Sequence, residues 1–485
     1  MKHLIYTVTG ALLFAAMSAA AMAADTEARH WHELDSSFRD QFRNPAEGVE
    51  LGLDLRLREV YARNIFGLDS RFGDPNGNWN DNHWQRFRAR LAATVSLDAD
   101  VTANTRLTWE FWNHCKPDDT PPGPLGFFAE KNTDFDEAII DILNVQFRNA
   151  FDMPLTMTVG RQEIILGTGW LILEGTPGDG SRTIFFDAIR ATYDVTSASK
   201  LDMIYIQQYD DASKWLKPIN HGAVADRRHL TQNQDERGLI LYYTNNDNPD
   251  WGYDAYYIYK NARRSSWAKF YNVAGSDADI HTVGGRLFGN LDTNWSYTAE
   301  LAKQWGNRDD NSMRGLGANT KLTYAFNDEQ KSRVFCGYEY LSGDDPSTSS
   351  SEKFDTLWGD WSQSQRGGDL QSYMWAAEGA LGEVANLHRL GAGHSFMPAP
   401  EWTILSQYNL LWADENPGGV WPYPSPQFSN SGNFRGHMFS GLITYRCCSN
   451  FSTHFMLDYF FPGGYYDKNT NDPAFFARVC VEWTF

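Results

Sequence analysis

The sequence predicts an all-β protein, a transmembrane antiparallel β-barrel of about 18 strands, and three observations carry this prediction. Apolar and polar residues alternate along many short segments, as in strands with one face toward lipid and the other toward water. Long and short connections between these segments alternate along the chain. The last alternating segment ends the chain at Phe485, an ending typical of bacterial outer-membrane barrels.

Residues 1–24 are expected to be a cleaved signal peptide. An apolar run follows Lys2 and His3, and residues 21–23 have the small-x-small form of a signal-peptidase site. This run is too short to cross a bilayer as a helix. We therefore expect export to the bacterial outer membrane, with a periplasmic N-terminal segment over 25–50 and a barrel over 51–485.

The clearest alternation lies in the first two predicted strands and in the last. In 51–58 four leucines occupy one face, and Asp54 and Arg56 lie on the other. Segment 84–97 alternates three arginines with apolar residues, and segment 474–485 is similarly two-sided. An apolar edge strand at the end of a chain invites aggregation unless it is paired, and closing a barrel pairs it.

The predicted strands are each about 10 to 13 residues long, enough to cross a bilayer when tilted. They lie near 51–63, 84–97, 102–112, 137–148, 155–163, 184–194, 200–209, 236–246, 251–262, 279–290, 294–305, 315–326, 332–342, 385–396, 401–412, 435–447, 451–460 and 474–485. Connections after odd-numbered strands are long, including 306–314 and 343–384, and those after even-numbered strands are short. A barrel with both termini in the periplasm has this alternation of long extracellular loops and short periplasmic turns.

The composition fits a barrel but also fits a soluble, secreted β-protein that binds carbohydrate. Aromatic residues make up 15% of the chain, although the mean hydropathy is only −0.50. A net charge of −19 argues against a nucleic-acid partner. The five cysteines show no metal-ligand spacing, so we assign no metal and no cofactor. Cys447 and Cys448 are adjacent, and on a regular strand they would point to opposite faces.

Several motifs, in their order along roughly residues 137–485, resemble the alginate export family of outer-membrane barrels. The motifs are Gly160-Arg161-Gln162-Glu163 with Gly167, Trp170, Arg182-Thr183 and Asp187, then Tyr297 to Gly306, Tyr340-Leu341-Ser342-Gly343-Asp344 with Phe354-Asp355, Asn386 to Gly391, Phe434 to His437, and Phe461 to Tyr466. The resemblance implies a porin or exporter whose selectivity comes from an electropositive constriction. It also places Arg161 and Arg182 in the family's shared block.

If the apolar faces point to lipid, the opposite faces line the lumen. The candidate pore-lining, anion-selecting residues are Arg56, Arg58, Arg86, Arg88, Arg90, Arg148, Arg161, Arg182, Arg190 and Arg389, and the candidate acidic partners are Asp54, Glu110, Glu163, Glu300 and Asp458. A guanidinium fork binds a carboxylate through two hydrogen bonds and stays charged. For any one arginine a structural ion pair is the alternative. The run of like charges at Arg86, Arg88 and Arg90 favours selectivity.

The predicted function is passive passage of an anionic polysaccharide or acidic solute through this arginine-lined lumen. The alternative is a non-conducting surface adhesion or structural barrel that binds carbohydrate through its loops. The chain has no nucleophile elbow, zinc-protease motif or phosphate loop, so we expect no enzymatic activity. The expected partners are outer-membrane lipid, the anionic solute and periplasmic export proteins, with the barrel itself a monomer.

Overall fold

The computed structural model describes residues 36–65, 68–69, 81–116, 134–174, 185–209, 216, 234–264, 277–359, 385–418 and 428–485. The expected signal peptide and Arg182 lie outside these residues.

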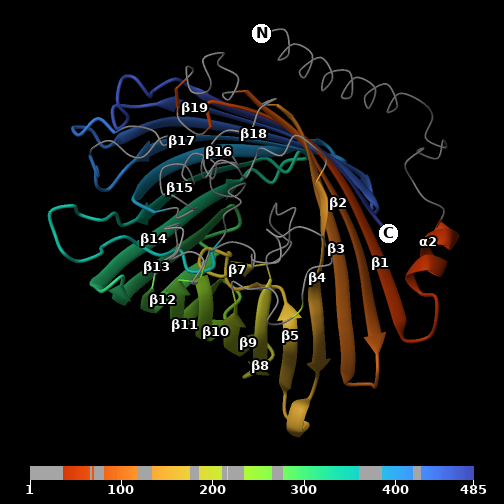
Figure 1. Cartoon of the computed structure of the whole chain (residues 1–485). Helices are drawn as coiled ribbons and strands as arrows, with labels where there is room; N and C mark the ends of the chain where they lie inside the picture. The colour runs from red at the N-terminus through yellow and green to blue at the C-terminus, as the bar shows by residue number, and fades with distance from the viewer. Residues whose placement is uncertain are drawn as a thin grey trace, which may run out of the picture.

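One antiparallel sheet of 18 strands closes on itself, and the predicted fold class and strand number are confirmed. The strands are β1 (Val49–Arg63), β2 (Asp81–Ser96), β3 (Val101–Lys116), β4 (Asp134–Phe147), β5 (Leu155–Gln162), β8 (Phe186–Asp194), β9 (Ser199–Gln208), β10 (Gln234–Asn245), β11 (Trp251–Arg264), β12 (Ala278–Asn290), β13 (Trp295–Arg308), β14 (Asn311–Ala325), β15 (Arg333–Leu341), β16 (Leu387–Ala399), β17 (Trp402–Trp412), β18 (Phe434–Cys448), β19 (Phe451–Pro462) and β20 (Ala474–Thr484). β20 pairs with β1, with Val481 opposite Leu57, so the sheet has no free edge. The strands follow one another around the wall in chain order (Figure 1).

The two faces of each strand differ as a membrane barrel requires. Leu57 of β1 and Leu91 of β2 point outward and are 39% and 49% exposed, whereas Arg56 and Arg88, their neighbours on the inner face, are 5% and 4% exposed. A water-soluble protein would show the reverse, because apolar side chains gain free energy by leaving water. The outer surface is therefore suited to lipid, and the polar residues lie inside the cylinder.

The connections follow the predicted alternation with one exception. We expected a loop over 306–314, but β13 and β14 extend toward each other, and only Asp309 and Asp310 separate them. Both residues have positive φ, 47° and 70°. Two central residues with positive φ form the hairpin turn whose twist matches that of the flanking strands. The expected loop at this position is thus wrong, because two aspartates adopt a conformation usually supplied by glycine or asparagine.

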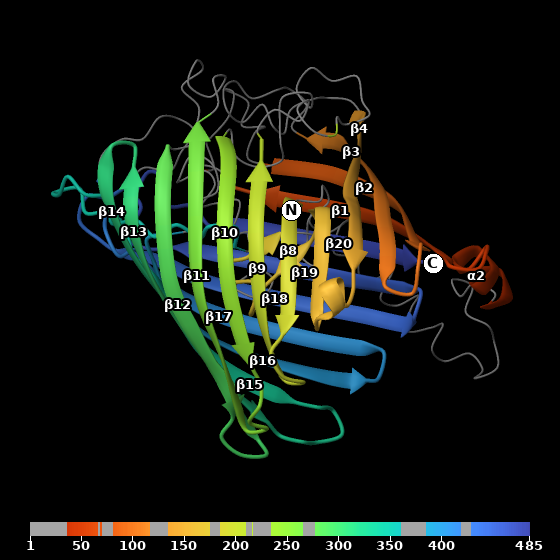
Figure 2. The same ribbon diagram turned by 90° about the horizontal axis from the view of Figure 1, so that it is seen from below.

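A short helix, α2 (Ser36–Arg43), precedes the barrel. It lies at the same end as the C terminus (Figure 2). The Nη1 of Arg39 donates a hydrogen bond of 2.9 Å to the Oγ of Ser449, in the turn between β18 and β19. No helix among the described residues is long and apolar enough to cross a membrane.

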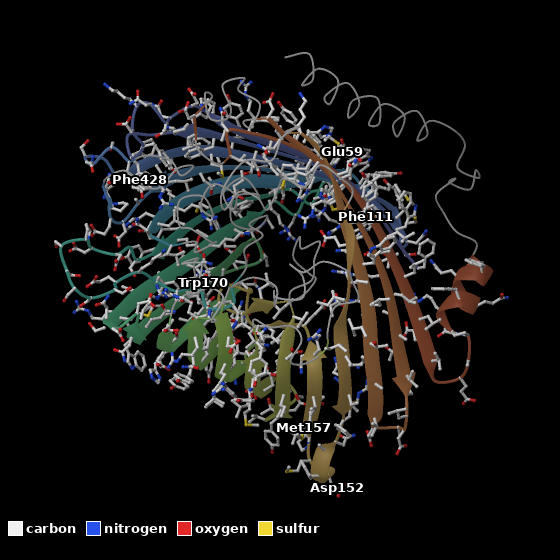
Figure 3. The ribbon with its side chains drawn as sticks, viewed as in Figure 1. Glu59, Phe111, Asp152, Met157, Trp170 and Phe428 are labelled. Atoms are coloured by element: carbon white, nitrogen blue, oxygen red, sulfur yellow. The ribbon has the colours of Figure 1, made fainter. Side chains whose placement is uncertain are left out.

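Part of the barrel interior is an apolar core, which simple alternation did not predict. Ile206, Ile240 and Ile258 face inward from neighbouring strands and are almost fully buried. Two segments fold against them, and we call these the inner loops: residues 164–174, which include β6 (Ile164–Ile165) and β7 (Leu173–Glu174), and residues 351–359. Trp170 of the first inner loop lies on the inner side of the wall (Figure 3).

The two faces can be tested by placing an arginine on each side of β2. Leu91→Arg puts a charge on the lipid face, and we expect it to lower the free energy of unfolding by about 2–4 kcal/mol. Thr94→Arg is the matched control, because Thr94 lies on the inner face opposite Glu50. Its expected cost is within about 1 kcal/mol. Denaturant unfolding in lipid vesicles measures both values, and equal costs would contradict the assignment of the faces.

Candidate functional site

Seven arginines lie on the inner face of four neighbouring strands, and we call this surface the arginine wall. Its members are Arg56 and Arg58 of β1, Arg86, Arg88 and Arg90 of β2, Arg106 of β3, and Arg478 of β20. The register places Arg56 directly opposite Arg88 and Arg58 directly opposite Arg86. Because side chains alternate along each strand, the three arginines of β2 share one face. Like charges directly opposite one another destabilise a sheet, so this arrangement has a cost.

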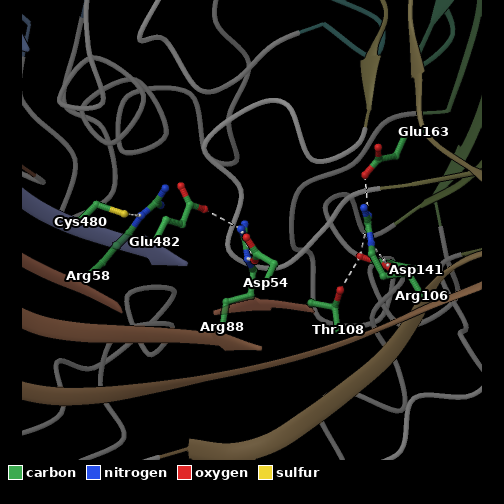
Figure 4. Close-up of polar contacts among 9 residues, drawn as sticks. All are labelled: Asp54, Arg58, Arg88, Arg106, Thr108, Asp141, Glu163, Cys480 and Glu482. Atoms are coloured by element: carbon green, nitrogen blue, oxygen red, sulfur yellow. Dashed lines mark hydrogen bonds and ion pairs between the residues drawn. The ribbon is translucent and has the colours of Figure 1, made fainter. Parts of the chain in front are cut away.

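Carboxylates on the neighbouring strands lower that cost. Arg88 lies 2.6 Å from Asp54 of β1 and 2.8 Å from Glu482 of β20, so one guanidinium spans three strands (Figure 4). Arg86 lies 3.0 Å from Glu110 of β3. The predicted partners Asp54 and Glu110 are therefore brought to the arginines of β2.

Arg106 extends the wall toward β4 and β5. Its Nε and Nη2 donate hydrogen bonds of 2.8 Å and 3.0 Å to the two carboxylate oxygens of Asp141, and Nη2 donates a third, of 2.5 Å, to Glu163. The hydroxyl of Thr108 also donates to Asp141, over 2.7 Å (Figure 4).

Sequence reasoning missed Arg106, Asp141 and Arg478 as site residues. Arg106 could have been predicted from the sequence, because it lies four residues from Glu110 and therefore on the same face of β3. Asp141 could not, because the register of β3 with β4 shifts beside Arg106 and leaves Asp141 as the unpaired residue of a bulge. Such a bulge reverses which face the following residues occupy.

Three other predicted arginines lie away from these strands and form local ion pairs. Arg161 binds Asp187 through two hydrogen bonds of 2.8 Å and 3.1 Å, and its guanidinium carbon lies 3.7 Å from the centroid of the Phe185 ring. Arg190 pairs with Asp202 at 2.9 Å. Such pairs match the structural alternative for single arginines.

Arg389 forms the third of these pairs, with Glu339 at 2.7 Å. The second carboxylate oxygen of Glu339 accepts a hydrogen bond of 2.9 Å from the indole of Trp170. A pair on the barrel wall therefore also holds an inner loop.

The remaining predicted residues are spread around the barrel. Arg148 follows the end of β4 and is exposed at the turn, where its backbone N–H donates to the carbonyl of Asp100. Glu300 is buried on the far wall and accepts a hydrogen bond of 2.9 Å from the hydroxyl of Tyr256. Asp458 is fully buried on β19. Arg148 and Glu300 therefore lie apart from the arginine wall, whereas Asp458 lies on the inner face of the strand that pairs with β20, next to the wall.

The inner loops are fastened to the wall that faces the arginines across the barrel. The indole of Trp358 donates to Glu236 over 2.7 Å, and Lys260 donates to the carbonyl of Leu357 over 2.8 Å. Gln304 makes two hydrogen bonds with the backbone of Asp355, one as donor and one as acceptor.

The two inner loops also pair with each other, although they are far apart in the sequence. The backbone N–H of Leu173 donates to the carbonyl of Trp358, and that of Trp358 donates to Leu171. The interior is thus two-sided, with a loop-covered wall on one side and the arginine wall on the other.

Titratable groups outside the strands form an acidic patch at the long-loop end of β15 to β17. Hydrogen bonds from Ser347 lower the pKa of the Asp345 carboxyl. Burial, reinforced by the charges of Asp345 and Asp414, raises the pKa of Glu415. Among the side chains that the structure describes, no group of three or more His, Cys, Asp or Glu residues is arranged to hold a metal ion.

The barrel is similar to known proteins in sequence and in structure. The family described as alginate export matches residues 47–465. Similar solved structures include Acinetobacter baumannii OccAB2 (TM-score 0.55, 10% identity, covering 90% of this chain and 98% of that one), Pseudomonas aeruginosa OpdQ (0.54, 9%, 91% and 99%) and a BenF-like porin from Pseudomonas fluorescens Pf-5 (0.52, 12%, 90% and 99%). At this identity the structural likeness shows the fold alone. Comparison with curated protein sequences gives no match.

The pair that anchors Trp170 gives a stability test. Arg389→Met leaves the Glu339 carboxylate buried without this cation, and we expect the free energy of unfolding to fall by about 3–5 kcal/mol. Arg389→Met combined with Glu339→Gln removes the uncompensated charge and keeps an acceptor for Trp170, so most of the loss should be recovered. Urea unfolding of the detergent-solubilised barrel gives both values. A double variant no more stable than Arg389→Met would refute this role for the pair.

Proposed function

Because this chain belongs to the alginate export family and forms a closed outer-membrane β-barrel, we propose that it gives passive passage to an anionic polysaccharide or a related acidic solute along the arginine wall. The observation that carries the proposal is the concentration of arginines on the inner face of β20, β1, β2 and β3. If these arginines only formed structural ion pairs, we would expect opposite charges to face each other across β1 and β2. Instead, Arg56 lies opposite Arg88, and Arg58 lies opposite Arg86.

The chemistry of the wall suits a chain of carboxylates. Guanidinium forks bind carboxylates through two hydrogen bonds, and arginine keeps its charge. Arg86, Arg88 and Arg90 follow one another every second residue, which spaces them about 7 Å apart along β2. Several sites in a row let a polyanion exchange one guanidinium for the next, and passage needs such weak, repeated binding rather than one strong site.

The carboxylates already on the wall make that exchange feasible. Arg88 lies between Asp54 and Glu482, so the carboxylate of a solute must compete with these two protein carboxylates for the guanidinium. The resident acids hold the guanidinium groups in place while no solute is bound. They also limit the affinity, because each new ion pair replaces an existing one.

The inner loops support the same path. They cover the wall opposite the arginines and are fastened to it by buried contacts such as Trp358 to Glu236 and Trp170 to Glu339. A solute that crosses the barrel beside them therefore passes close to the arginine wall. The same loops favour a second candidate, a non-conducting surface barrel, if they seal the interior altogether.

Residues 1–24 are proposed to be a signal peptide removed on export, and residues 25–50 to lie in the periplasm. The barrel is proposed to act as a monomer, with periplasmic export proteins as partners.

Planar bilayers test the path directly. The wild-type channel should favour anions, and the triple substitution of Arg86, Arg88 and Arg90 by alanine should lower the anion-to-cation permeability ratio by roughly fivefold, the factor that about 1 kcal/mol of Coulomb energy gives. The matched control removes three arginines outside the wall, Arg43, Arg263 and Arg314, whose side chains are exposed. It should leave the ratio unchanged.

Two results would overturn the proposal. Cation selectivity that the triple alanine variant leaves unchanged would remove the arginine wall from the mechanism. Absence of conductance in bilayers that contain folded barrels would favour the non-conducting surface barrel. Liposome swelling with neutral against acidic oligosaccharides of equal length then identifies the class of solute.

A further inference from the structure

Cys447 and Cys448 are the last two residues of β18, directly before the two-residue turn that leads to β19. In a regular strand, adjacent side chains point to opposite faces, which is the expectation from the sequence. The structure corrects it. The register between β18 and β19 shifts between Tyr445 and Cys448, and the two Sγ atoms lie 2.9 Å apart. A bulge therefore brings two neighbouring thiols together.

The pair lies at the short-turn end of the barrel. In the turn that follows it, the carbonyl of Asn450 accepts a hydrogen bond from the N–H of Thr484, and Ser449 accepts one from Arg39 of α2. Short turns mark the periplasmic side of an outer-membrane barrel. The periplasm is an oxidising compartment, and both thiols are partly exposed there.

We propose that Cys447 and Cys448 form a redox-active dithiol, a site that takes a disulfide as its oxidant and closes to a vicinal disulfide. One thiol loses its proton, and its thiolate attacks a sulfur of the oxidant disulfide, breaking that S–S bond and releasing one thiol. The thiolate of the neighbouring cysteine then attacks the sulfur of the mixed disulfide and releases the second thiol. Two electrons and two protons pass to the oxidant, and an eight-membered ring closes across one peptide bond.

The other three cysteines lie elsewhere in the barrel, where they do not compete with Cys447 and Cys448 as disulfide partners. Cys480 is buried on the inner face of β20, where its sulfur accepts a hydrogen bond from Arg58. Cys336 lies in the middle of β15, opposite Ala392 of β16. Cys115 lies near the long-loop end of β3. Within the described residues, the adjacent pair is thus the one in which both thiols share a site.

Mass spectrometry of the full-length protein tests the proposal. Arg446 and Lys468 bound a tryptic peptide whose cysteines are Cys447 and Cys448. The reduced barrel is exposed to oxidised glutathione, alkylated and digested. We expect this peptide to lose two hydrogen atoms, to take up no alkylating agent and to carry no glutathione. Phenylarsine oxide, which bridges two close sulfurs, should protect the reduced pair from alkylation.

Single substitutions give the controls. Cys448→Ser leaves one thiol, so its peptide should carry glutathione and lose protection by phenylarsine oxide, whereas Cys336→Ser should behave as the wild type. Heat-dependent mobility in gel electrophoresis verifies that each barrel is folded. Two alkylated thiols after oxidation, two glutathiones on the wild-type peptide, or a crosslink to the peptide of Cys480 would each overturn the proposal.

Discussion

The pairing of β20 with β1 is the contact on which the rest of this structure depends. Hydrocarbon offers no hydrogen-bond partner, so every strand must be paired on both sides, and only closure supplies the final pair. Closure also gives the sheet an inside and an outside. Once Val481 lies opposite Leu57, alternation places apolar side chains toward lipid and Arg56 and Arg58 toward the interior.

We call the contact between β20 and β1 the seam. Both strands belong to the arginine wall, so barrel closure and the proposed function depend on the same side chains. Arg88 of β2 reaches Glu482 of β20 past the intervening strand β1, and so links both sides of the seam. Breaking that link removes an ion pair and leaves a buried charge, which costs more than the pair contributes. The charges of the wall thus favour one register at the seam, because a shift by one residue would move Glu482 to the lipid face.

Period-two alternation was enough to predict the strand number and the faces of the first two strands. It failed where a bulge, or a segment far away in the sequence, determines which side chains come together inside the barrel. Bulges place Asp141 beside Arg106 and bring Cys447 and Cys448 together, and alternation cannot locate an inserted residue. Ile240 faces inward although the lumen was expected to be polar, because inner loops from far along the chain cover that wall.

The two walls use charge differently, and this difference bears on function. On the loop-covered wall, cations such as Arg389 and Lys260 serve local contacts, with Glu339 and with the carbonyl of Leu357. On the arginine wall, cations stand opposite cations in register, an arrangement that folding alone disfavours. Acids flank these cations, since Glu482 lies opposite Arg56 and Glu110 lies opposite Arg88, but they do not separate the arginines of β1 from those of β2. The proposed passage of an anionic solute accounts for arginines that lie opposite one another despite this cost.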